Sequence, residues 1–309
     1  MHYKKSLLFM TIILMTVNLF SIFAVEKGSA SSNIIWVDDD YFYPSESDGS
    51  MEKPYTNIQL GIDAAEEGDT VFIREGTYSS FTLKKKVAIK GESLTNTFVR
   101  GGTKEPYLIE ITSNYSSIEN LKIWDTTPTT HRKAVVRVSP SANHVKIVNI
   151  LINESYNGYG IQIEGDNTII EESTIHDTKG VYLLNSNVNT IFNNSIYNCR
   201  NNYGIYMISS NDNHIEQNTI NNSYFGIYSR KSSDNKYINN AIFDNSFEGI
   251  KIKTGSGDTI KKNTIYKNEE GIEIASSSCN IISNTIYNNS IGIKIMDDDG
   301  AIKNNIIND

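Results

Sequence analysis

The sequence predicts an all-β solenoid, in which the chain winds into stacked coils of short parallel strands. The first observation is a glycine followed by isoleucine or valine, which recurs seven times with steps of 20 to 24 residues. These glycines are Gly160, Gly180, Gly204, Gly226, Gly249, Gly271 and Gly292. The second observation is the motif Ile-x-x-Asn-x-Ile, which follows six of them, once with Tyr237 in its first position. The third is that no segment between the motifs has the apolar spacing of a helix. A period of about 22 residues made of strands and turns is typical of solenoids.

Each Gly-Ile-x-Ile segment alternates apolar and polar residues, which predicts a strand with one buried face. Equivalent residues of successive coils then stack about 4.8 Å apart. We therefore expect one continuous inward column, formed by Ile161, Val181, Ile205, Ile227, Ile250, Ile272 and Ile293.

The asparagine of the second motif predicts a ladder along one turn of the solenoid. Asparagine tolerates the left-handed backbone conformation that turns need and bonds to the backbone through its side chain. Stacked amides can also bond from coil to coil. The expected ladder consists of Asn194, Asn218, Asn240, Asn263, Asn284 and Asn305.

Residues 1–30 read as a secretory signal peptide. Lys4 and Lys5 precede an apolar run from Leu7 to Val25, and cleavage could follow Ala24 or Ala30. The alternative is an uncleaved anchor, because a run of this length just reaches across a bilayer.

The mature chain is expected to have two parts. Residues 31–70 predict a strand, a loop and a short helix that covers the open end of the first coil. Thr56 and Gln59 have capping-box spacing at the start of that helix, and Gly68 ends it. Residues 71–309 predict the solenoid, with regular repeats from residue 160.

The repeats, together with Trp36–Asp40, Pro54–Gln59 and Gly68–Tyr78, resemble the right-handed parallel β-helix of the pectin lyase-like superfamily. The resemblance is closest to the NosD-type, carbohydrate-associated proteins with PbH1 repeats found on archaeal and bacterial surfaces. It implies a right-handed β-helix with an amino-terminal cap and a groove on the outer face of one sheet. It is specific for fold and says little about function, because one fold hosts many sites.

The net charge of the chain narrows the classes of molecule that it is expected to bind. The chain has a formal net charge of −8, whereas nucleic-acid binding needs a basic footprint. We therefore expect no nucleic-acid partner. The expected partner is a polysaccharide or another glycan of the cell envelope. A membrane would be contacted only through an uncleaved leader.

The middle residues of the Gly-Ile-x-Ile strands include three tyrosines on successive coils, Tyr182, Tyr206 and Tyr228. Aromatic side chains contribute apolar area with a polar tip, so this ladder is the candidate carbohydrate-binding surface. The alternative is that these residues serve β-structure and cross-strand stacking alone.

Four acidic or basic residues near the glycines are the candidate catalytic groups, namely Glu248, Glu270, Asp177 and His176. A glycoside hydrolase needs two carboxyl groups about 5 to 9.5 Å apart. Glu248 and Glu270 on adjacent coils could reach that distance, as could Asp177 and Glu164 if the turn folds back. The alternative is a solvated column of surface carboxylates.

Family motifs offer little support for an enzyme. The Asn-Thr-Asp and Gly-His-Gly motifs of polygalacturonases and the Asp-Pro-His motif of alginate epimerases are absent. A lyase of this superfamily would use arginine or lysine as base and usually Ca²⁺, and the arginines do not align with an acidic cluster.

Few residues of the sequence are candidates for metal binding or redox chemistry. Asp38, Asp39 and Asp40 could ligate Ca²⁺ if backbone carbonyls complete the shell, although such a run is also typical of a solvated loop. Apart from calcium we expect no cofactor. NosD-like copper delivery is disfavoured because the histidines are scattered. Cys199 and Cys279 are about four coils apart, too far for a disulfide.

The sequence therefore predicts an exported surface protein that binds polysaccharide or serves as an envelope scaffold. A polysaccharide lyase or glycoside hydrolase of the same fold is the alternative, and metal delivery is the least favoured function.

Overall fold

The computed structural model describes residues 32–101, 105–125, 132–153, 157–199, 201–297 and 300–308. The chain separates into two units, Met1–Ser32 and Asn33–Asp309. The predicted signal peptide, residues 1–30, lies outside the described residues, so it stays a prediction. Within the described ranges, no helix has the length and apolar character needed to cross a membrane.

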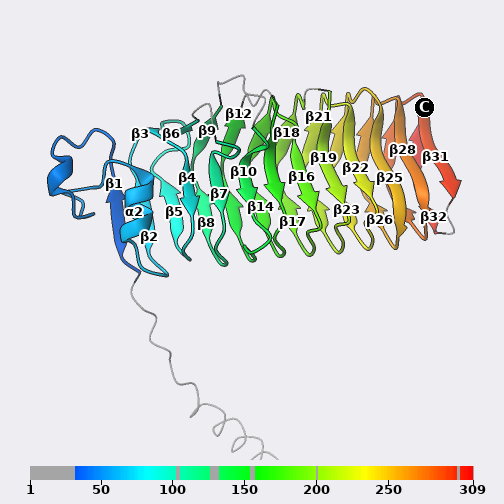
Figure 1. Ribbon diagram of the computed structural model, residues 1–309. Helices are drawn as coiled ribbons and strands as arrows, with labels where there is room; N and C mark the ends of the chain where they lie inside the picture. Colours follow the sequence, from blue (N-terminus) through cyan, green and yellow to red (C-terminus); the bar gives the residue numbers. More distant parts are fainter. Residues whose placement is uncertain are drawn as a thin grey trace, which may run out of the picture. The chain divides into compact units, whose positions relative to one another are not determined.

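The Asn33–Asp309 unit is a parallel β-solenoid whose strands stack side by side along one axis (Figure 1). Three parallel sheets, here called A, B and C, run the length of the stack. In the regular part the chain passes from sheet C to sheet A to sheet B and then returns to sheet C. Each such coil adds one strand to every sheet, which confirms the all-β solenoid predicted from the repeat.

The described strands of sheet A are β1 (Ile34–Val37), β2 (Thr70–Ile73), β5 (Ala88–Gly91), β8 (Ser117–Glu119), β11 (Lys146–Val148), β14 (Ile169–Glu171), β17 (Thr190–Phe192), β20 (His214–Glu216), β23 (Lys236–Ile238), β26 (Thr259–Lys261), β29 (Asn280–Ile282) and β32 (Ile302–Lys303).

Those of sheet B are β3 (Gly76–Tyr78), β6 (Thr97–Arg100), β9 (Lys122–Trp124), β12 (Leu151–Asn153), β15 (Thr174–His176), β18 (Ser195–Tyr197), β21 (Thr219–Asn221), β24 (Ala241–Phe243), β27 (Thr264–Tyr266), β30 (Thr285–Tyr287) and β33 (Ile306–Asn308).

Those of sheet C are β4 (Phe81–Leu83), β7 (Ile109–Ile111), β10 (Ala134–Val138), β13 (Tyr159–Ile163), β16 (Val181–Leu184), β19 (Tyr203–Ile208), β22 (Phe225–Arg230), β25 (Glu248–Ser256), β28 (Glu270–Ser277) and β31 (Ile291–Asp297).

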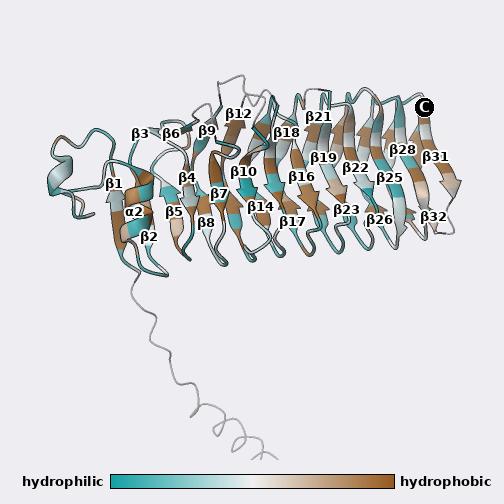
Figure 2. Ribbon diagram, viewed as in Figure 1, coloured by the Kyte–Doolittle hydropathy of each residue, from teal (hydrophilic) through white to brown (hydrophobic). Residues whose placement is uncertain are grey.

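The core is a set of aliphatic columns inside the coils. Ile161 pairs with Val181, Val181 with Ile205, and the register continues in step to Ile293, as predicted. These residues are fully buried up to Ile272, and Ile293 is partly buried. Figure 2 shows the apolar positions as bands that follow the stacked strands. Because burying one isoleucine contributes about 1.5–3 kcal/mol, the stacked columns are the main source of stability.

The predicted asparagine ladder is present in the turn between sheets A and B. From Asn194 to Asn284, each ladder side chain donates its Nδ2 to the Oδ1 of the next, at 2.9 to 3.1 Å. The left-handed residue, however, is the one before each ladder asparagine, such as Asn193 and Gln217. The assignment of left-handed geometry to the ladder residue itself was therefore wrong.

Two further ladders were not predicted as ladders. One, between sheets C and A, runs through Asn189, Asn213 and Asn235 to Asp258. The other, between sheets B and C, contains Asn245, Asn268 and Asn289. All three turns of the regular coils thus have hydrogen-bonded stacks, which hold successive coils at a fixed spacing.

The amino-terminal helix is α2 (Ile58–Ala64), and a 3-10 helix, η1 (Pro44–Glu46), precedes it. α2 buries Ile58 and Ile62 and packs against β1, β2 and β4, so it covers the first coil as predicted. Its N-cap is Asn57, whose side chain accepts a hydrogen bond from Leu60 N, and not Thr56 as the capping-box spacing suggested.

Candidate functional site

The outer face of sheet C holds polar and aromatic side chains in register over ten described strands. Because side chains alternate along a strand, the middle residue of each strand points outward. The resulting column consists of Thr82, Glu110, Arg137, Gln162, Tyr182, Tyr206, Tyr228, Lys251, Glu273 and Lys294. This column and the residues that precede the glycines are together called the sheet C face.

The centre of this face is an aromatic stack. The predicted ladder of Tyr182, Tyr206 and Tyr228 forms the central row of this stack. The ring centroids of Tyr182 and Tyr206 are 5.2 Å apart, and those of Tyr206 and Tyr228 are 5.5 Å apart. Rings from the residues that precede the glycines join it. The complete stack is Tyr159, Tyr182, Tyr203, Tyr206, Phe225, Tyr228 and Phe247.

The geometry of the stack limits how a sugar can meet it. The planes of Tyr182, Tyr206 and Tyr228 are within 16° of parallel to their neighbours, so these rings cover one another's faces. They present edges and hydroxyl groups to solvent instead. Burial raises the pKa of Tyr182 and Tyr206, so the hydroxyls stay protonated and can donate hydrogen bonds. Sugars can stack flat on a ring only at the ends of the row.

The carboxyl-terminal part of the face is a Glu–Lys cluster, made of Glu248, Lys251, Glu270, Glu273 and Lys294. The structure brings the predicted pair Glu248 and Glu270 together as register neighbours. Glu273 joins them, and one carboxylate oxygen from each of the three lies within 4.8 Å of the others. Lys251 contacts Glu248 and lies 3.0 Å from Glu273. Lys294 lies 2.8 Å from Glu270.

Charge in the cluster does not balance without a proton. Three carboxylates face two ammonium groups. Burial, followed by the hydrogen bond to Glu273, raises the pKa of Glu248. Burial opposes ionisation of Glu273 as well, but hydrogen bonds with Glu248 and Lys251 outweigh it and lower the pKa of Glu273 to about 2. The two pKa shifts have opposite directions, so a proton taken up by the cluster resides on Glu248 rather than on Glu273.

One oxygen from each carboxylate of the cluster lies within 4.8 Å of the others, so these groups are close together on the scale of the two carboxyl groups of a glycoside hydrolase, which are about 5–5.5 Å apart in retaining enzymes. Of the described residues, only these three offer converging ligands for a metal ion. The two lysines already supply the positive charge that an ion would bring.

The other candidate catalytic residues lie elsewhere. His176 is on β15 of sheet B, where its ring stacks on Tyr197 with centroids 4.8 Å apart. Its Nδ1 is 2.7 Å from Asp177 Oδ2. Asp177 follows β15 of sheet B, whereas its conditional partner Glu164 follows β13 of sheet C and is bound by Arg137 and Gln162.

The acidic run near the amino terminus has structural partners. Asp38 forms an ion pair with Arg74 at 2.9 Å. Asp39 accepts a hydrogen bond from Thr77 N at 2.9 Å, which fixes the loop to β3. Asp40 is exposed, and its backbone N–H donates to Asp38. Calcium binding by this run stays a prediction.

Cys199 and Cys279 are both buried and are not joined by a disulfide, as predicted. Burial raises the pKa of the Cys199 thiol to about 12, which keeps it protonated and unreactive.

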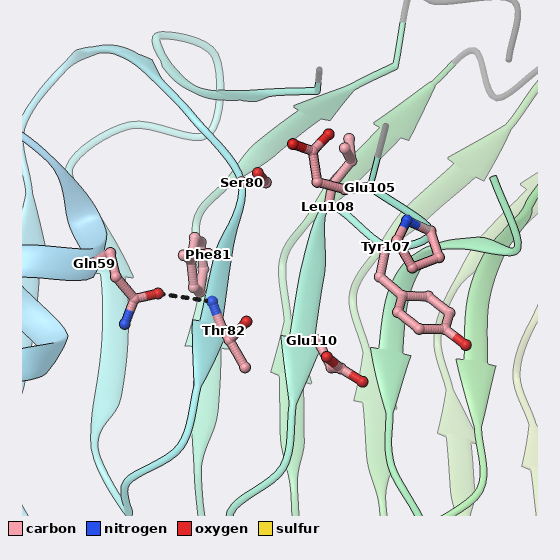
Figure 3. Close-up of a pocket in the computed structure, with 9 residues that line it drawn as sticks. Gln59, Ser80, Phe81, Thr82, Glu105, Tyr107, Leu108 and Glu110 are labelled. Atoms are coloured by element: carbon pink, nitrogen blue, oxygen red, sulfur yellow. Dashed lines mark hydrogen bonds between the residues drawn. The ribbon is translucent and has the colours of Figure 1, made fainter. Parts of the chain in front are cut away.

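The amino-terminal part of the sheet C face contains a shallow cavity of about 230 Å³ (Figure 3). Gln59 lies on one side, where its Oε1 accepts a hydrogen bond from Thr82 N at 2.9 Å, and Tyr107 and Glu110 lie on the other. Arg137 bridges Glu110 at 2.6 Å and Glu164 at 2.8 Å, and its guanidinium lies over the Tyr107 ring. The polar groups here are largely satisfied by one another.

A second cavity of about 430 Å³, here called the Tyr159 pocket, adjoins the amino-terminal end of the aromatic stack. Its lining residues are Arg132, Lys133, Asn157, Tyr159, Gln162 and Lys179. Sequence reasoning missed it, because Lys133 and Lys179 precede different strands and only the fold brings them beside Tyr159.

This architecture defines a class of protein, the parallel β-helix in which the outer face of one sheet carries a column of polar and aromatic side chains. The sequence matches the family described as "Right handed beta helix region" over residues 107–255 and 179–309. The chain therefore belongs to the right-handed β-helix family, which agrees with the right-handed parallel β-helix that the resemblance implied. A search of curated protein sequences finds no match. The closer resemblance to NosD-type proteins stays a prediction.

Solved structures are similar in fold. The mannuronan C-5 epimerase AlgE4 A-module of Azotobacter vinelandii is 19% identical with a TM-score of 0.63, covering 75% of this chain and 73% of its own. The Dettilon tailspike protein is 18% identical with a TM-score of 0.69, covering 82% of this chain and 55% of its own. Pectate lyase Pel9A is 12% identical with a TM-score of 0.65, and the match covers 89% of this chain and 80% of Pel9A. At these identities the likeness establishes the fold alone.

Proposed function

We propose that this chain is an exported protein that binds polysaccharide along the sheet C face. The observation that carries the proposal is the continuity of that face. Ten described strands hold one column of outward side chains, in which polar groups flank a stack of seven aromatic rings. An extended, rigid surface with regularly spaced hydrogen-bonding groups suits an extended polymer better than a compact ligand.

The comparisons agree with a glycan partner. The similar structures include a mannuronan epimerase and a pectate lyase, which act on polysaccharides, and a complex of XylC with xylose. An extracellular glycan requires export, for which the leader at residues 1–30 is the proposed signal. Fusing residues 1–30 to a reporter enzyme tests this. Export of the fusion supports the proposal, and retention inside the cell contradicts it.

Binding is tested by affinity electrophoresis of the full chain in gels that contain neutral or acidic polysaccharides. The proposal predicts slower migration in at least one polysaccharide gel, by an amount that grows with polymer concentration. A globular protein of equal charge is the control. Unchanged migration throughout a broad panel would contradict the proposal.

A polysaccharide lyase or hydrolase is the second candidate, favoured by one observation. Burial raises the pKa of Glu248, whereas the pKa of the neighbouring Glu273 is lowered to about 2, and a pair of carboxyl groups with opposite shifts is typical of an acid–base site. The assay is release of reducing ends or unsaturated products from the same panel, with and without Ca²⁺. Turnover that Glu248→Gln abolishes would establish the enzyme. An absence of products would leave binding as the function.

A further inference from the structure

The outer face of sheet B has no acidic residue, lysine or arginine over seven consecutive described strands, β12 to β30. Each strand is three residues long, and its middle residue is buried in the core while the first and third face outward. The outward residues are Leu151, Asn153, Thr174, His176, Ser195, Tyr197, Thr219, Asn221, Ala241, Phe243, Thr264, Tyr266, Thr285 and Tyr287. Charged residues make up 21% of the chain, so a surface of this size would ordinarily carry several.

The other two sheets carry charge in the same coils. Sheet A has Glu171, Glu216 and Lys261 at outward positions. Sheet C has Lys251 and Glu273. The centre of a protein–protein interface is typically depleted in charged residues and enriched in aromatic ones, tyrosine among them. Of the three sheets, sheet B therefore has the outer face whose composition is typical of an interface.

The sheet B face consists of two columns of different height. The first column holds small residues in its central five strands, namely Thr174, Ser195, Thr219, Ala241 and Thr264. The second column holds rings, in which His176 stacks on Tyr197 at 4.8 Å between centroids. Further along, Tyr266 stacks on Phe243 at 4.8 Å and on Tyr287 at 4.9 Å. The small column lets a second surface approach, and the rings supply apolar contact area.

Charged residues flank this face in a polar order along the solenoid. At the turn between sheets A and B, the left-handed residues of five successive coils are Glu172, Asn193, Gln217, Asn239 and Lys262, all exposed. Glu172 lies two coils before Gln217, and Lys262 lies two coils after it. In the described part of the chain, neither of these charged residues forms a salt bridge. At the turn between sheets B and C, Asp177 belongs to the coil of Glu172, and Lys267 to that of Lys262.

This order makes the face complementary to itself about a two-fold axis that runs parallel to the strands through β21. Such an axis reverses the sequence of coils and keeps each edge opposite the same edge of the second copy. Glu172 then faces the partner's Lys262, Asp177 faces the partner's Lys267, and each pair occurs twice. Asp244, at the second edge, faces an uncharged residue. A parallel arrangement would instead set Glu172 against the partner's Asp177.

The face is large enough for a specific contact. Seven strands at about 4.8 Å extend about 34 Å along the solenoid, and five residue steps separate the two edges by about 17 Å. Two such faces together cover about 1,150 Å², which exceeds the total of about 1,000 Å² expected of a specific interface.

We propose that two copies of this chain associate antiparallel through the outer faces of sheet B, about a two-fold axis at β21. The uncharged centre avoids the repulsion that two chains of net charge −8 would otherwise meet there. The charged pairs at the edges fix the antiparallel direction. This association is independent of polysaccharide binding and leaves the sheet C face of both copies uncovered.

The dissociation constant of the dimer is measured by sedimentation velocity of the full chain over a wide range of concentrations. Thr219→Arg sets two arginines against each other at the axis and is expected to weaken the dimer at least about a hundredfold. Thr190→Arg is the matched control, because Thr190 is also the half-buried first residue of a three-residue strand, β17 of sheet A. It is expected to change the constant less than about twofold.

Equal melting temperatures of the two variants confirm that both are folded. Wild type that stays monomeric at every concentration overturns the proposal. Equal dissociation constants of the two variants overturn the assignment of the contact to sheet B.

A charge exchange tests the antiparallel direction. Glu172→Lys and Lys262→Glu, made singly, each turn two attractive pairs into repulsive ones and are expected to weaken the dimer about tenfold. The double variant restores opposite charges and is expected to dimerise like wild type. A double variant as weak as either single one contradicts the antiparallel arrangement.

Cross-linking locates the axis, since the native cysteines are buried. Asn221→Cys lies at the axis, whereas Tyr287→Cys lies about 29 Å along the solenoid from its counterpart in the second copy. A short bis-maleimide is expected to join the Asn221→Cys chains into covalent dimers and to leave the Tyr287→Cys chains single. Equal cross-linking of the two variants overturns an axis at β21.

Discussion

The aromatic stack and the Glu–Lys cluster occupy the same two columns of sheet C, one after the other. The column of Tyr206 and Tyr228 continues as Lys251 and Glu273, and that of Tyr203 and Phe225 lies in line with Glu248 and Glu270. The backbone spacing is the same in both regions. What differs is how neighbouring side chains satisfy one another. The rings contact one another by stacking, whereas the three carboxylates of the cluster exceed its two ammonium groups by one charge.

The difference shows that the solenoid fixes where side chains lie but not what they can bind. A stack of rings covers its own faces, so its interior offers edges and hydroxyl groups. A charged cluster neutralises itself, so its interior offers little net charge.

The largest effect is expected from the scaffold that both regions share. Asn240 is buried, accepts from Asn218 and donates to Asn263 and to Ile215 O. Asn240→Leu leaves several of these groups without partners, at about 1–3 kcal/mol each. We expect a loss of about 3–5 kcal/mol in the free energy of unfolding, measured by urea denaturation. The exposed control Lys236→Gln should change it by less than about 0.5 kcal/mol. A loss below about 1 kcal/mol for Asn240→Leu would show that the ladder is dispensable.

The second largest effect is expected in the Glu–Lys cluster and has no counterpart in the aromatic stack. Lys251→Met removes the ammonium group that contacts the buried Glu248 and Glu273 and should cost about 3 kcal/mol at pH 7. Urea denaturation at pH 4 and pH 7 measures it. The cost should shrink at pH 4, because protonation relieves the repulsion between the carboxylates. A cost that does not depend on pH would mean that the cluster is held by packing and not by charge.

Asp258 is a buried carboxyl group that forms no salt bridge with a lysine in the described part of the chain, and it can be compared with the carboxylates of the Glu–Lys cluster. Asp258 ends the ladder between sheets C and A, is fully buried, and has an Oδ2 without a hydrogen-bond partner among the described residues. Burial raises its pKa to about 7, whereas the lysine-paired Glu273 has its pKa lowered to about 2. The two carboxyl groups thus shift in opposite directions, because burial dominates at Asp258, whereas hydrogen bonds with Glu248 and Lys251 outweigh burial at Glu273.

The sign of the pH effect follows from the proton count. Between the unfolded pKa near 4 and the folded pKa near 7, folded Asp258 holds a proton that the unfolded chain has lost. Stability contributed by Asp258 is therefore full below pH 4 and falls as pH rises to about 7. Asp258→Asn removes this decline and extends the amide ladder.

We expect the Asp258→Asn chain to be about 2 kcal/mol more stable than wild type at pH 8 and no more stable at pH 4. Thermal unfolding at both pH values measures the difference, with Asp212→Asn at an exposed turn as the control. A gain of equal size at both pH values would contradict the assignment of a buried, protonated carboxyl group.

The smallest effect is expected inside the aromatic stack. Tyr206→Leu removes three ring contacts but leaves the half-buried position apolar, so we expect a loss of about 1 kcal/mol that does not depend on pH. Urea denaturation measures it. A loss as large as that of Lys251→Met would show that the stack is a main stabilising element and would weaken its interpretation as a binding surface.

The sequence determined the fold to the level of individual columns. A strict period places Ile161 over Val181 and Asn194 over Asn218, so alignment of the repeats predicts these contacts. The other two ladders were harder to predict, because many turn residues are asparagine. Which of them turns inward depends on the left-handed residue that precedes it, and single residue types do not reveal that position.

The site was predicted in part. Glu248 and Glu270 were placed as neighbours from the repeat, but the participation of Glu273 and the lysines requires side-chain geometry. The Tyr159 pocket could not be predicted, since Lys133 precedes the first regular repeat at Gly160 and its register is set only by pairing of β10 with β13. The covered faces of the tyrosine rings are likewise a matter of ring orientation, which the repeat does not specify.

The most direct test of polysaccharide binding is to block the sheet C face physically. The native cysteines are buried, so a single introduced cysteine can be labelled with a bulky maleimide–polyethylene glycol. Tyr206→Cys places the label on the sheet C face, and Thr190→Cys places it on sheet A. Affinity for a polysaccharide that wild type binds is then compared before and after labelling. The account predicts that labelling the Tyr206→Cys chain abolishes binding and that labelling the Thr190→Cys chain leaves it unchanged. Undiminished binding after labelling on sheet C would contradict it.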